Sequence, residues 1–204
     1  MAMPVVLSLP LRTGILLFCL SIWLGQYFLI NNSNLGNRTR KNWSTNWDLM
    51  IPFVPQMTIP YISAYIFGIL PFLIIEDVKL FFYTLLGYFM VTFIGSGMHV
   101  VFPSQILSNE KIEPTGISMT LLYWVRQISK PYDNFPSTHV AFSVLTVGTC
   151  SLSRGPAFGG VLMIWALVIT ASTLLTKQHY FLDVVSGSLL GLAAFILVRL
   201  ICNC

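Results

Sequence analysis

The sequence predicts an all-α integral membrane protein, a bundle of six transmembrane helices that forms a single membrane-embedded domain over residues 1–204. Two observations predict this fold class. Of the 204 residues, 55% are hydrophobic and only 9% are charged, whereas a soluble domain usually carries about 25% charged residues. So few charged side chains cannot cover a globule of this length. The apolar residues also gather into runs close to the roughly 20 residues that cross a bilayer.

Six apolar runs are predicted to span the membrane: residues 11–30, 59–75, 80–102, 138–152, 157–175 and 181–201. The second run contains Pro71 and the fourth is short, so their ends are the hardest to place. Two connecting loops, residues 31–58 and 103–137, are long and polar, and the others are short. With six spans, both long loops and the turn before the last span lie on one face of the membrane.

One segment of the second long loop has helical periodicity. Ile117, Leu121, Val125 and Ile128 recur on one face of a helix. We therefore expect residues 117–128 to form a short interfacial helix in the loop between the third and fourth spans. A short helix packed on the bundle is the alternative.

Two histidines stand where apolar helices begin. His139 follows Pro136, Ser137 and Thr138 at the start of the fourth span, and His179 lies just before the sixth. A hairpin through the fifth span returns both helices to the same surface. The sequence therefore predicts that the two histidines belong to one site.

The second histidine has a carboxylate four residues later. On a helix, His179 and Asp183 would lie on the same face, one turn apart. A carboxylate bonded to one ring nitrogen leaves the other nitrogen as an outward-facing lone pair. This arrangement prepares a histidine as a base or nucleophile.

The residues around the histidines suit an anion. Ser137 or Thr138 is a good helix N-cap, and the free N–H groups of the first turn can cradle an anion. Lys177, Arg126 and Lys130 lie on the same face and add positive charge. We therefore predict a phosphate site in which one histidine attacks phosphorus and the other protonates the leaving oxygen. The site offers too few oxygen ligands for Mg²⁺, so we expect no metal or other cofactor.

Two further motifs have structural interpretations. Gly187 and Gly191 form a G-x-x-x-G pattern, which predicts close packing of the sixth span against its neighbours. His99, near the end of the third span, is predicted to be structural.

Two stretches, "FPSTHVA" and "STLLTKQHYFLDVVSG", resemble the second and third signatures of the type 2 phosphatidic acid phosphatase superfamily. Those signatures are P-S-x-H and S-R-x5-H-x3-D, and the resemblance covers residues 133–191. It implies a six-helix membrane bundle that cleaves or transfers lipid phosphate without metal. By position, it implies that His179 is the nucleophile forming a phosphohistidine and that Asp183 orients it. His139 would be the general acid, and Ser137 would bind phosphate.

The sequence departs from the family pattern in two places. Thr173 stands where the third signature has arginine, and the first signature, K-x6-R-P, is absent. Fewer fixed cations suit a phosphodiester better than a dianionic monoester. The inositol phosphorylceramide synthase branch also has a Ser-Thr pair here and is similar around "HYFLD". Transfer of a phosphorylated headgroup to a lipid alcohol is therefore an alternative to hydrolysis.

The leading hypothesis is a metal-independent membrane lipid phosphatase, with a phosphotransferase as the second enzyme. A non-enzymatic lipid-phosphate binder or transporter, with His179 and Asp183 as a proton relay, is an alternative of another class. The expected partners are a phosphorylated lipid and membrane lipids; without a Lys/Arg run we expect no nucleic acid. Counting basic residues would place the site in the cytoplasm. The resemblance implies an extracytoplasmic or lumenal site, which we expect.

Overall fold

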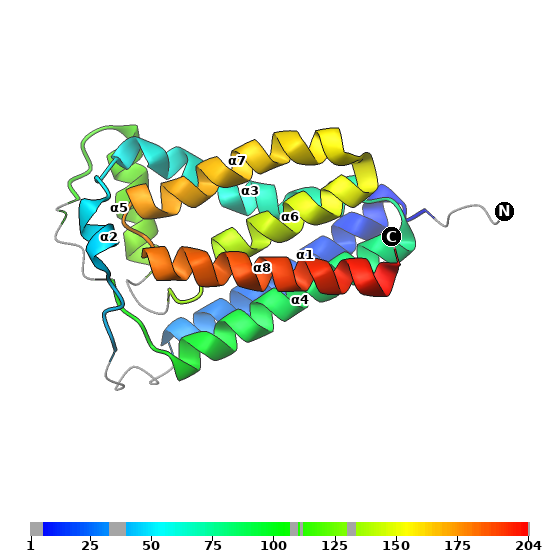
Figure 1. Ribbon diagram of the computed structural model, residues 1–204, viewed down its shortest axis with the longest axis horizontal. Helices are drawn as coiled ribbons and strands as arrows, with labels where there is room; N and C mark the ends of the chain where they lie inside the picture. The colour runs from blue at the N-terminus through cyan, green and yellow to red at the C-terminus, as the bar shows by residue number, and fades with distance from the viewer. Residues whose placement is uncertain (1–5, 33–39, 107–109, 111, 130–133, 204) are drawn as a thin grey trace.

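A computed structural model describes residues 6–32, 40–106, 110, 112–129 and 134–203, which form eight α-helices and no β-strand. Six of the helices are long: α1 (Leu9–Asn32), α3 (Thr58–Ile74), α4 (Val78–Val101), α6 (Thr138–Arg154), α7 (Pro156–Leu175) and α8 (Phe181–Cys202). They run side by side as a bundle (Figure 1). Three short elements lie at one end of it: α2 (Asn46–Met50), the 3-10 helix η2 (Pro55–Met57) and α5 (Ile117–Ile128). We call this the capped end.

Among the described helices, five are long and apolar enough to cross a membrane: α1, α3 with η2, α4, α7 and α8. The chain is thus a multi-pass membrane protein. The predicted count of six spans is not confirmed, because α6 has 17 residues. At 1.5 Å per residue it is about 25 Å long, shorter than a hydrocarbon core of about 30 Å.

The short helix α6 occupies the centre of the bundle and packs against α3, α4, α7 and α8. Its interior face includes hydroxyl side chains that bond within the protein. Ser143 and Thr149 donate to carbonyl oxygens one turn earlier, each at 2.8 Å. Thr146 pairs with the Tyr88 hydroxyl at 2.7 Å. Because α6 is surrounded by helices, it can carry polar residues that a lipid-facing span could not.

The glycines of α8 allow a close approach to α6, as predicted. A Cβ atom added at Gly187 would lie 2.3 Å from the carbonyl oxygen of Ser137, and one at Gly191 would lie 2.4 Å from that of Ala141. The backbone N–H of Ser137 also donates to the carbonyl of Asp183 at 3.0 Å. The start of α6 and the start of α8 are therefore held together.

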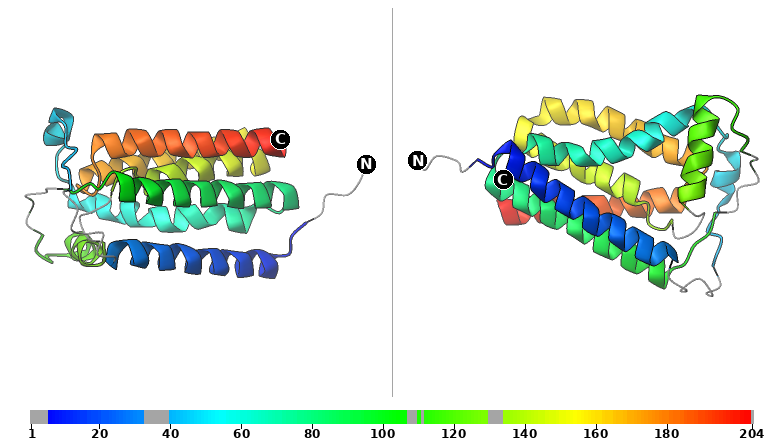
Figure 2. Two further views of the ribbon diagram at one scale, coloured as in Figure 1. Left: turned by 90° about the horizontal axis from the view of Figure 1, so that it is seen from below. Right: turned by 180° about the vertical axis from the view of Figure 1, so that it is seen from behind.

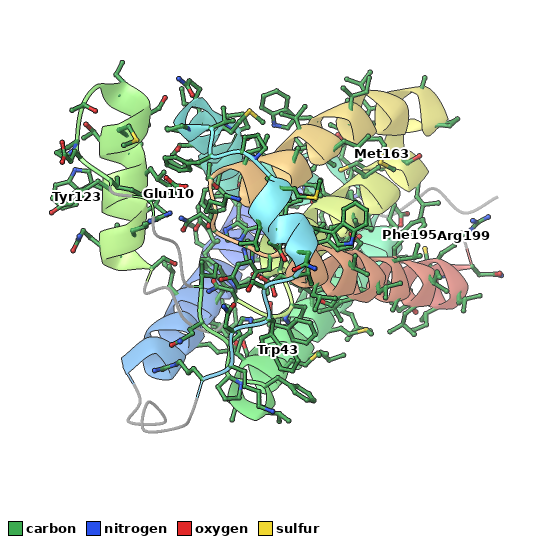
Figure 3. The ribbon with its side chains drawn as sticks, turned by 60° about the vertical axis from the view of Figure 1, so that its left-hand side comes forward. Trp43, Glu110, Tyr123, Met163, Phe195 and Arg199 are labelled. Atoms are coloured by element: carbon green, nitrogen blue, oxygen red, sulfur yellow. The ribbon has the colours of Figure 1, made fainter. Side chains whose placement is uncertain are left out.

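The end of the bundle opposite the capped end is held by arginines. Arg12 donates to the carbonyl of Leu73 at 2.7 Å, and Arg154 donates to that of Ile74 at 3.1 Å. Both arginines bond to the C-terminus of α3, where basic side chains are favourable. Figure 3 shows Arg199 of α8 at this same end, far from Tyr123 of α5.

Helix α5 has the predicted bounds and lies across the capped end rather than along the bundle (Figure 2). It packs against α3 and η2, and Leu122 is fully buried. Three apolar side chains, Ile117, Trp124 and Ile128, are at least 57% exposed.

Candidate functional site

The two histidines are held at the capped end by the starts of two helices. His139 is the second residue of α6, whose N-cap is Ser137. His179 lies in the turn before α8, whose N-cap is Tyr180. The prediction that His179 and Asp183 share one face of a helix is therefore wrong for His179. Asp183 caps the helix instead, since its Oδ2 accepts the Tyr180 N–H at 2.7 Å, and α8 begins only after the histidine.

The structure nevertheless brings Asp183, His179 and His139 into one line. Nδ1 of His179 lies 3.5 Å from Oδ2 of Asp183, within ion-pair distance but without hydrogen-bond alignment. Nε2 of His179 lies 3.4 Å from Nδ1 of His139. A proton on Nδ1 of His179, facing the carboxylate, leaves Nε2 as the acceptor. His139 then donates to it through Nδ1.

The site is buried and contains polar atoms without partners. His179 is 6% exposed and Asp183 is 1% exposed. Three buried atoms have no hydrogen-bond partner among the described residues: Nε2 of His139, Nδ1 of His179 and Oδ1 of Asp183. Buried polar atoms are rarely left in this state because each costs stability. This cluster is therefore suited to binding a polar group.

Two tyrosines of α3 flank His139. Ring centroids lie 4.9 Å apart for Tyr61 and His139, and 5.2 Å apart for Tyr65 and His139. Both rings pack against the imidazole on the side of α3, while His179 lies against it with ring centroids 5.5 Å apart. These two tyrosines were not identified from the sequence. Their spacing of four residues, which places them on one face of a helix, was the one local signal.

Asp48 is a second residue that sequence reasoning missed. It is 6% exposed, although it lies in the first long loop. Its Oδ1 accepts the N–H of Phe181, the first residue of α8, at 2.7 Å. Its Oδ2 accepts the backbone N–H and the hydroxyl of Thr45, each at 2.7 Å. The T-x-x-D pattern indicates a helix N-terminus at Thr45, but nothing local indicates the bond to α8.

Lys177, two residues before His179 in the chain, also bonds to the segment that contains Asp48. Its ammonium donates to the carbonyl of Asp48 at 2.8 Å and to that of Ile51. Its backbone is left-handed, with φ at 54°, the conformation usual after a helix C-terminus. The segment 48–51 is thus bonded to Lys177, two residues before His179, and to Phe181, two residues after it.

Of the other predicted phosphate-binding residues, the structure describes Ser137, Thr138 and Arg126. Ser137 is fully buried, and its Oγ accepts the Val140 N–H at 3.5 Å as an N-cap. Thr138 lines a cavity beside His139. Arg126 donates to the carbonyl of Thr176 at 3.5 Å, and burial lowers the pKa of its guanidinium, against an opposing effect of Glu110. Lys130 lies outside the described residues.

The position where the resembled family has arginine is part of the support for His179. Thr173 is fully buried. Its carbonyl accepts the backbone N–H groups of Gln178 at 3.0 Å and His179 at 3.1 Å. His99, predicted to be structural, has Nε2 3.4 Å from the carbonyl oxygen of Pro136.

The family model described as the PAP2 superfamily matches residues 77–203. This is more than half of the chain, from the N-cap of α4 to the end of α8, and it includes both histidine motifs. No curated protein and no solved structure shows a significant match to the chain. The match to the family model is sufficient, and the chain belongs to the PAP2 superfamily.

Proposed function

We propose that this protein is an integral membrane lipid phosphatase that hydrolyses a lipid phosphate ester through a phosphohistidine intermediate. Members of the PAP2 superfamily are generally phosphatases or phosphotransferases. The observation that carries the proposal is the line formed by Asp183, His179 and His139, buried where two helices of a membrane bundle begin. A nucleophile, its orienting carboxylate and a second histidine are the groups that such a reaction requires.

In the first step, the lone pair on Nε2 of His179 attacks phosphorus, and the bond from phosphorus to the lipid oxygen breaks. His139 gives its proton to that leaving oxygen. The two ring nitrogens are 3.4 Å apart, so the rings must separate to admit the phosphoryl group. Asp183 stabilises the positive charge that develops on His179.

In the second step, the now neutral His139 removes a proton from water. The resulting hydroxide attacks phosphorus, and the phosphorus–nitrogen bond of the intermediate breaks. Inorganic phosphate leaves, and both histidines return to their starting protonation states.

We assign phosphate binding to the first turn of α6, with Ser137 and Thr138, and to the cations Lys177, Arg126 and Lys130. The free N–H groups of a helix start favour anions. Arg126 donates to the carbonyl of Thr176 in the α7–α8 turn, and Lys177, which belongs to that turn, donates to the carbonyl of Asp48. Their charge therefore lies close to the histidine turn.

A second candidate is a phosphotransferase, in which a lipid alcohol replaces water in the second step. It is favoured by Thr173, a buried threonine whose carbonyl is bonded to the histidine turn, where the family signature has a cation. A site with fewer cations suits a phosphodiester, which carries one negative charge. Both reactions share the first step and differ only in the acceptor.

We propose six spans, in which α6 joins the five longer helices as the fourth span in chain order, and α5 lies in the interface. A helix of 17 residues is at the lower limit for a span. The exposed Ile117, Trp124 and Ile128 of α5 provide an apolar surface of the kind that enters the headgroup region. We place the site on the extracytoplasmic or lumenal face.

The test is phosphate release from a panel of phospholipids by the purified protein in detergent, with and without EDTA. We expect release that EDTA does not reduce, and none from the variant His179→Ala. Complete loss in EDTA with recovery in Mg²⁺ would contradict the metal-independent mechanism. Headgroup transfer to an added lipid alcohol would favour the transferase. Lipid binding with neither reaction would favour a non-enzymatic binder.

A further inference from the structure

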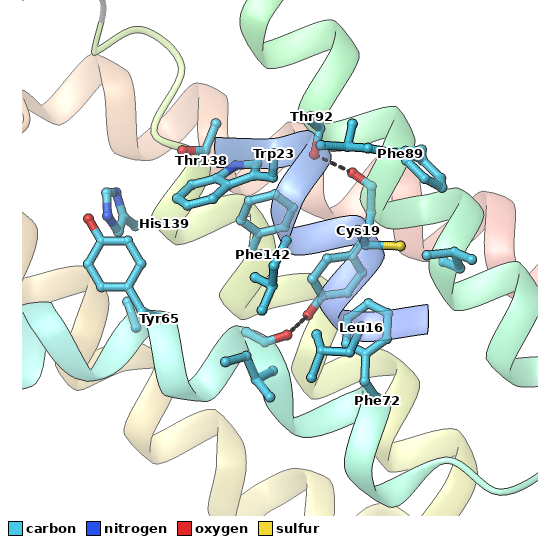
Figure 4. A pocket seen from close by; sticks show the side chains of 17 residues that line it. Leu16, Cys19, Trp23, Tyr65, Phe72, Phe89, Thr92, Thr138, His139 and Phe142 are labelled. Carbon is cyan, nitrogen blue, oxygen red and sulfur yellow. Dashed lines mark hydrogen bonds between the residues drawn. The ribbon is translucent and has the colours of Figure 1, made fainter. Parts of the chain in front are cut away.

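An apolar cavity of about 140 Å³ lies between α1, α3, α4 and α6. Figure 4 shows His139 and Tyr65 toward one end of it, with Trp23 and Phe142 next to them and Leu16 and Phe72 farther along. Thr138 also lines the cavity, whereas His179 does not. The cavity therefore adjoins the histidine proposed as the acid, not the proposed nucleophile.

The dimensions of the cavity suit one hydrocarbon chain. Along α3 its lining extends from Ala64 to Phe72, and along α1 it covers the seven residue steps from Leu16 to Trp23. Seven residues of helix correspond to about 10 Å. A dry apolar cavity of roughly 150 Å³ takes a guest the size of benzene. The volume is therefore enough for a short length of one chain and too small for two chains in parallel.

The polar atoms deep in the cavity are already satisfied. The Tyr88 hydroxyl bonds to the Gly68 carbonyl at 2.8 Å and to the Thr146 hydroxyl at 2.7 Å. Thr92 donates to the carbonyl of Tyr88 at 2.8 Å. An apolar chain beside them leaves no hydrogen bond unmade, so burying it costs no polar desolvation of these groups.

We propose that this cavity binds a single hydrocarbon chain of the leaving alcohol. The inference rests on the proposed function. Because His139 protonates the leaving oxygen, the group attached to that oxygen lies on the cavity side of phosphorus. The bond that breaks is therefore the one between phosphorus and the chain-bearing alcohol.

Gly68 and Cys19 set the length of chain that the cavity accepts. Gly68 lies in the middle of the lining stripe of α3, and a Cβ atom added there meets no heavy atom within 4 Å. Cys19 lines the cavity from α1. A larger side chain at either position fills space that the substrate chain would use.

The test uses the purified full-length protein in detergent with n-alkyl phosphates from butyl to tetradecyl. For wild type, kcat/KM rises about fourfold per buried methylene, equivalent to ~0.8 kcal/mol, until the cavity is full, and then levels off. In Gly68→Leu and in Cys19→Phe it levels off at a shorter chain. The matched control is Gly160→Leu on α7, where an added Cβ also meets nothing within 4 Å and which does not line the cavity. It keeps the wild-type profile.

A second measurement separates failure of this inference from failure of the proposed function. Non-hydrolysable n-alkyl phosphonates raise Tm more as the chain lengthens, and Gly68→Leu and Cys19→Phe reduce that dependence, whether or not the protein turns over. Chain-dependent stabilisation without turnover would refute only the phosphatase proposal. Turnover with the same chain-length profile in wild type and both cavity variants would overturn the cavity assignment. If one variant fails to fold, the other decides.

Discussion

At the residue scale, three hydrogen bonds hold His179 and the residues two positions before and after it. Its own N–H donates to the Thr173 carbonyl at 3.1 Å. Lys177, two residues before it, and Phe181, two residues after it, are both bonded to Asp48. A reacting group held in this way loses little freedom when the substrate binds. Asp48, which holds the residues on both sides of His179, should therefore affect the reaction rate more than substrate affinity.

Substitution of the two histidines should have different effects on formation of the phosphoenzyme. His179→Ala removes the nucleophile, so it should form no covalent adduct. His139→Ala should still be phosphorylated by a nitrophenyl phosphate, because that leaving group needs no proton. The reason for this assignment is that Asp183 faces His179 at 3.5 Å. Trapping radiolabelled enzyme from each variant checks it, and label that persists in His179→Ala but vanishes in His139→Ala would reverse the roles.

Asp48→Ala should lower kcat by roughly tenfold to a hundredfold and leave KM nearly unchanged. The variant removes a charge-assisted hydrogen bond to the first N–H of α8, and such bonds are worth about 1.5–3 kcal/mol. Asp48→Asn keeps an acceptor oxygen and should recover much of the rate. Leu49→Ala is the control on the same helix, since Leu49 is 79% exposed. Steady-state kinetics suffice, and a rise in KM alone in Asp48→Ala would argue against a positioning role.

Lys177→Ala should lower substrate affinity and turnover together, by roughly an order of magnitude or more in kcat/KM. It removes a cation and keeps a residue with a Cβ at a left-handed φ of 54°, a conformation that costs about 1–2 kcal/mol for lysine and alanine alike. Lys177→Gly removes the cation without that strain. The glycine variant should therefore have the higher Tm but equally low activity. Wild-type kcat/KM in both variants would show that the ammonium is dispensable.

At the scale of elements, the contact between α6 and α8 determines the geometry of the site. Gly187 faces Ser137 and Gly191 faces Ala141, both through backbone oxygens. Backbone cannot yield as a flexible side chain can, so even one added methyl must push the helices apart. Displacement of α8 would move Asp183 relative to the start of α6.

Gly191→Ala should therefore destabilise the protein by roughly 1–3 kcal/mol, the usual cost of overpacking, although alanine is the better helix former. Gly160→Ala on α7 is the matched control, because an added Cβ there meets nothing within 4 Å. The control should have a Tm equal to or above that of wild type. Thermal unfolding in detergent measures both, and a higher Tm for Gly191→Ala would refute the close contact.

At the scale of the whole molecule, the bundle has two unlike ends. The capped end carries α2, α5 and the two histidines, while the other end joins α3 to Arg12 and Arg154. The start of α1 and the end of α8 both lie at this second end (Figure 1). A chain that crosses the membrane an even number of times has its first and last helix ends on the same side, in agreement with this arrangement.

If the two ends of the bundle lie on opposite sides of the membrane, cysteine reporters at the two ends should be labelled from opposite sides. A reporter at the α6–α7 hairpin, Gly155, and one after α8 should react from the same side of the membrane. A reporter at Glu113, which is exposed beside α5, should react from the opposite side. Labelling in sealed vesicles makes the measurement. Reaction of Gly155 and Glu113 from the same side would show that α6 does not span.

The sequence by itself determined much of the local structure. Apolar runs predicted the long helices, and the periodicity of residues 117–128 predicted α5 with its observed bounds. The spacing of Gly187 and Gly191 predicted close packing of α8. These features were predictable because each follows from neighbouring residues along one helix, where the chain itself sets the geometry.

Only the tertiary structure decided what surrounds the two histidines. It showed that α6 is enclosed by four helices and that His179 precedes α8 instead of lying within it. It also brought Asp48 to Phe181 across 133 positions and placed Tyr61 and Tyr65 against His139. The physical reason is that such contacts join segments far apart in the chain, and their energy comes from packing and capping between helices. The spacing of residues within one segment cannot predict such contacts.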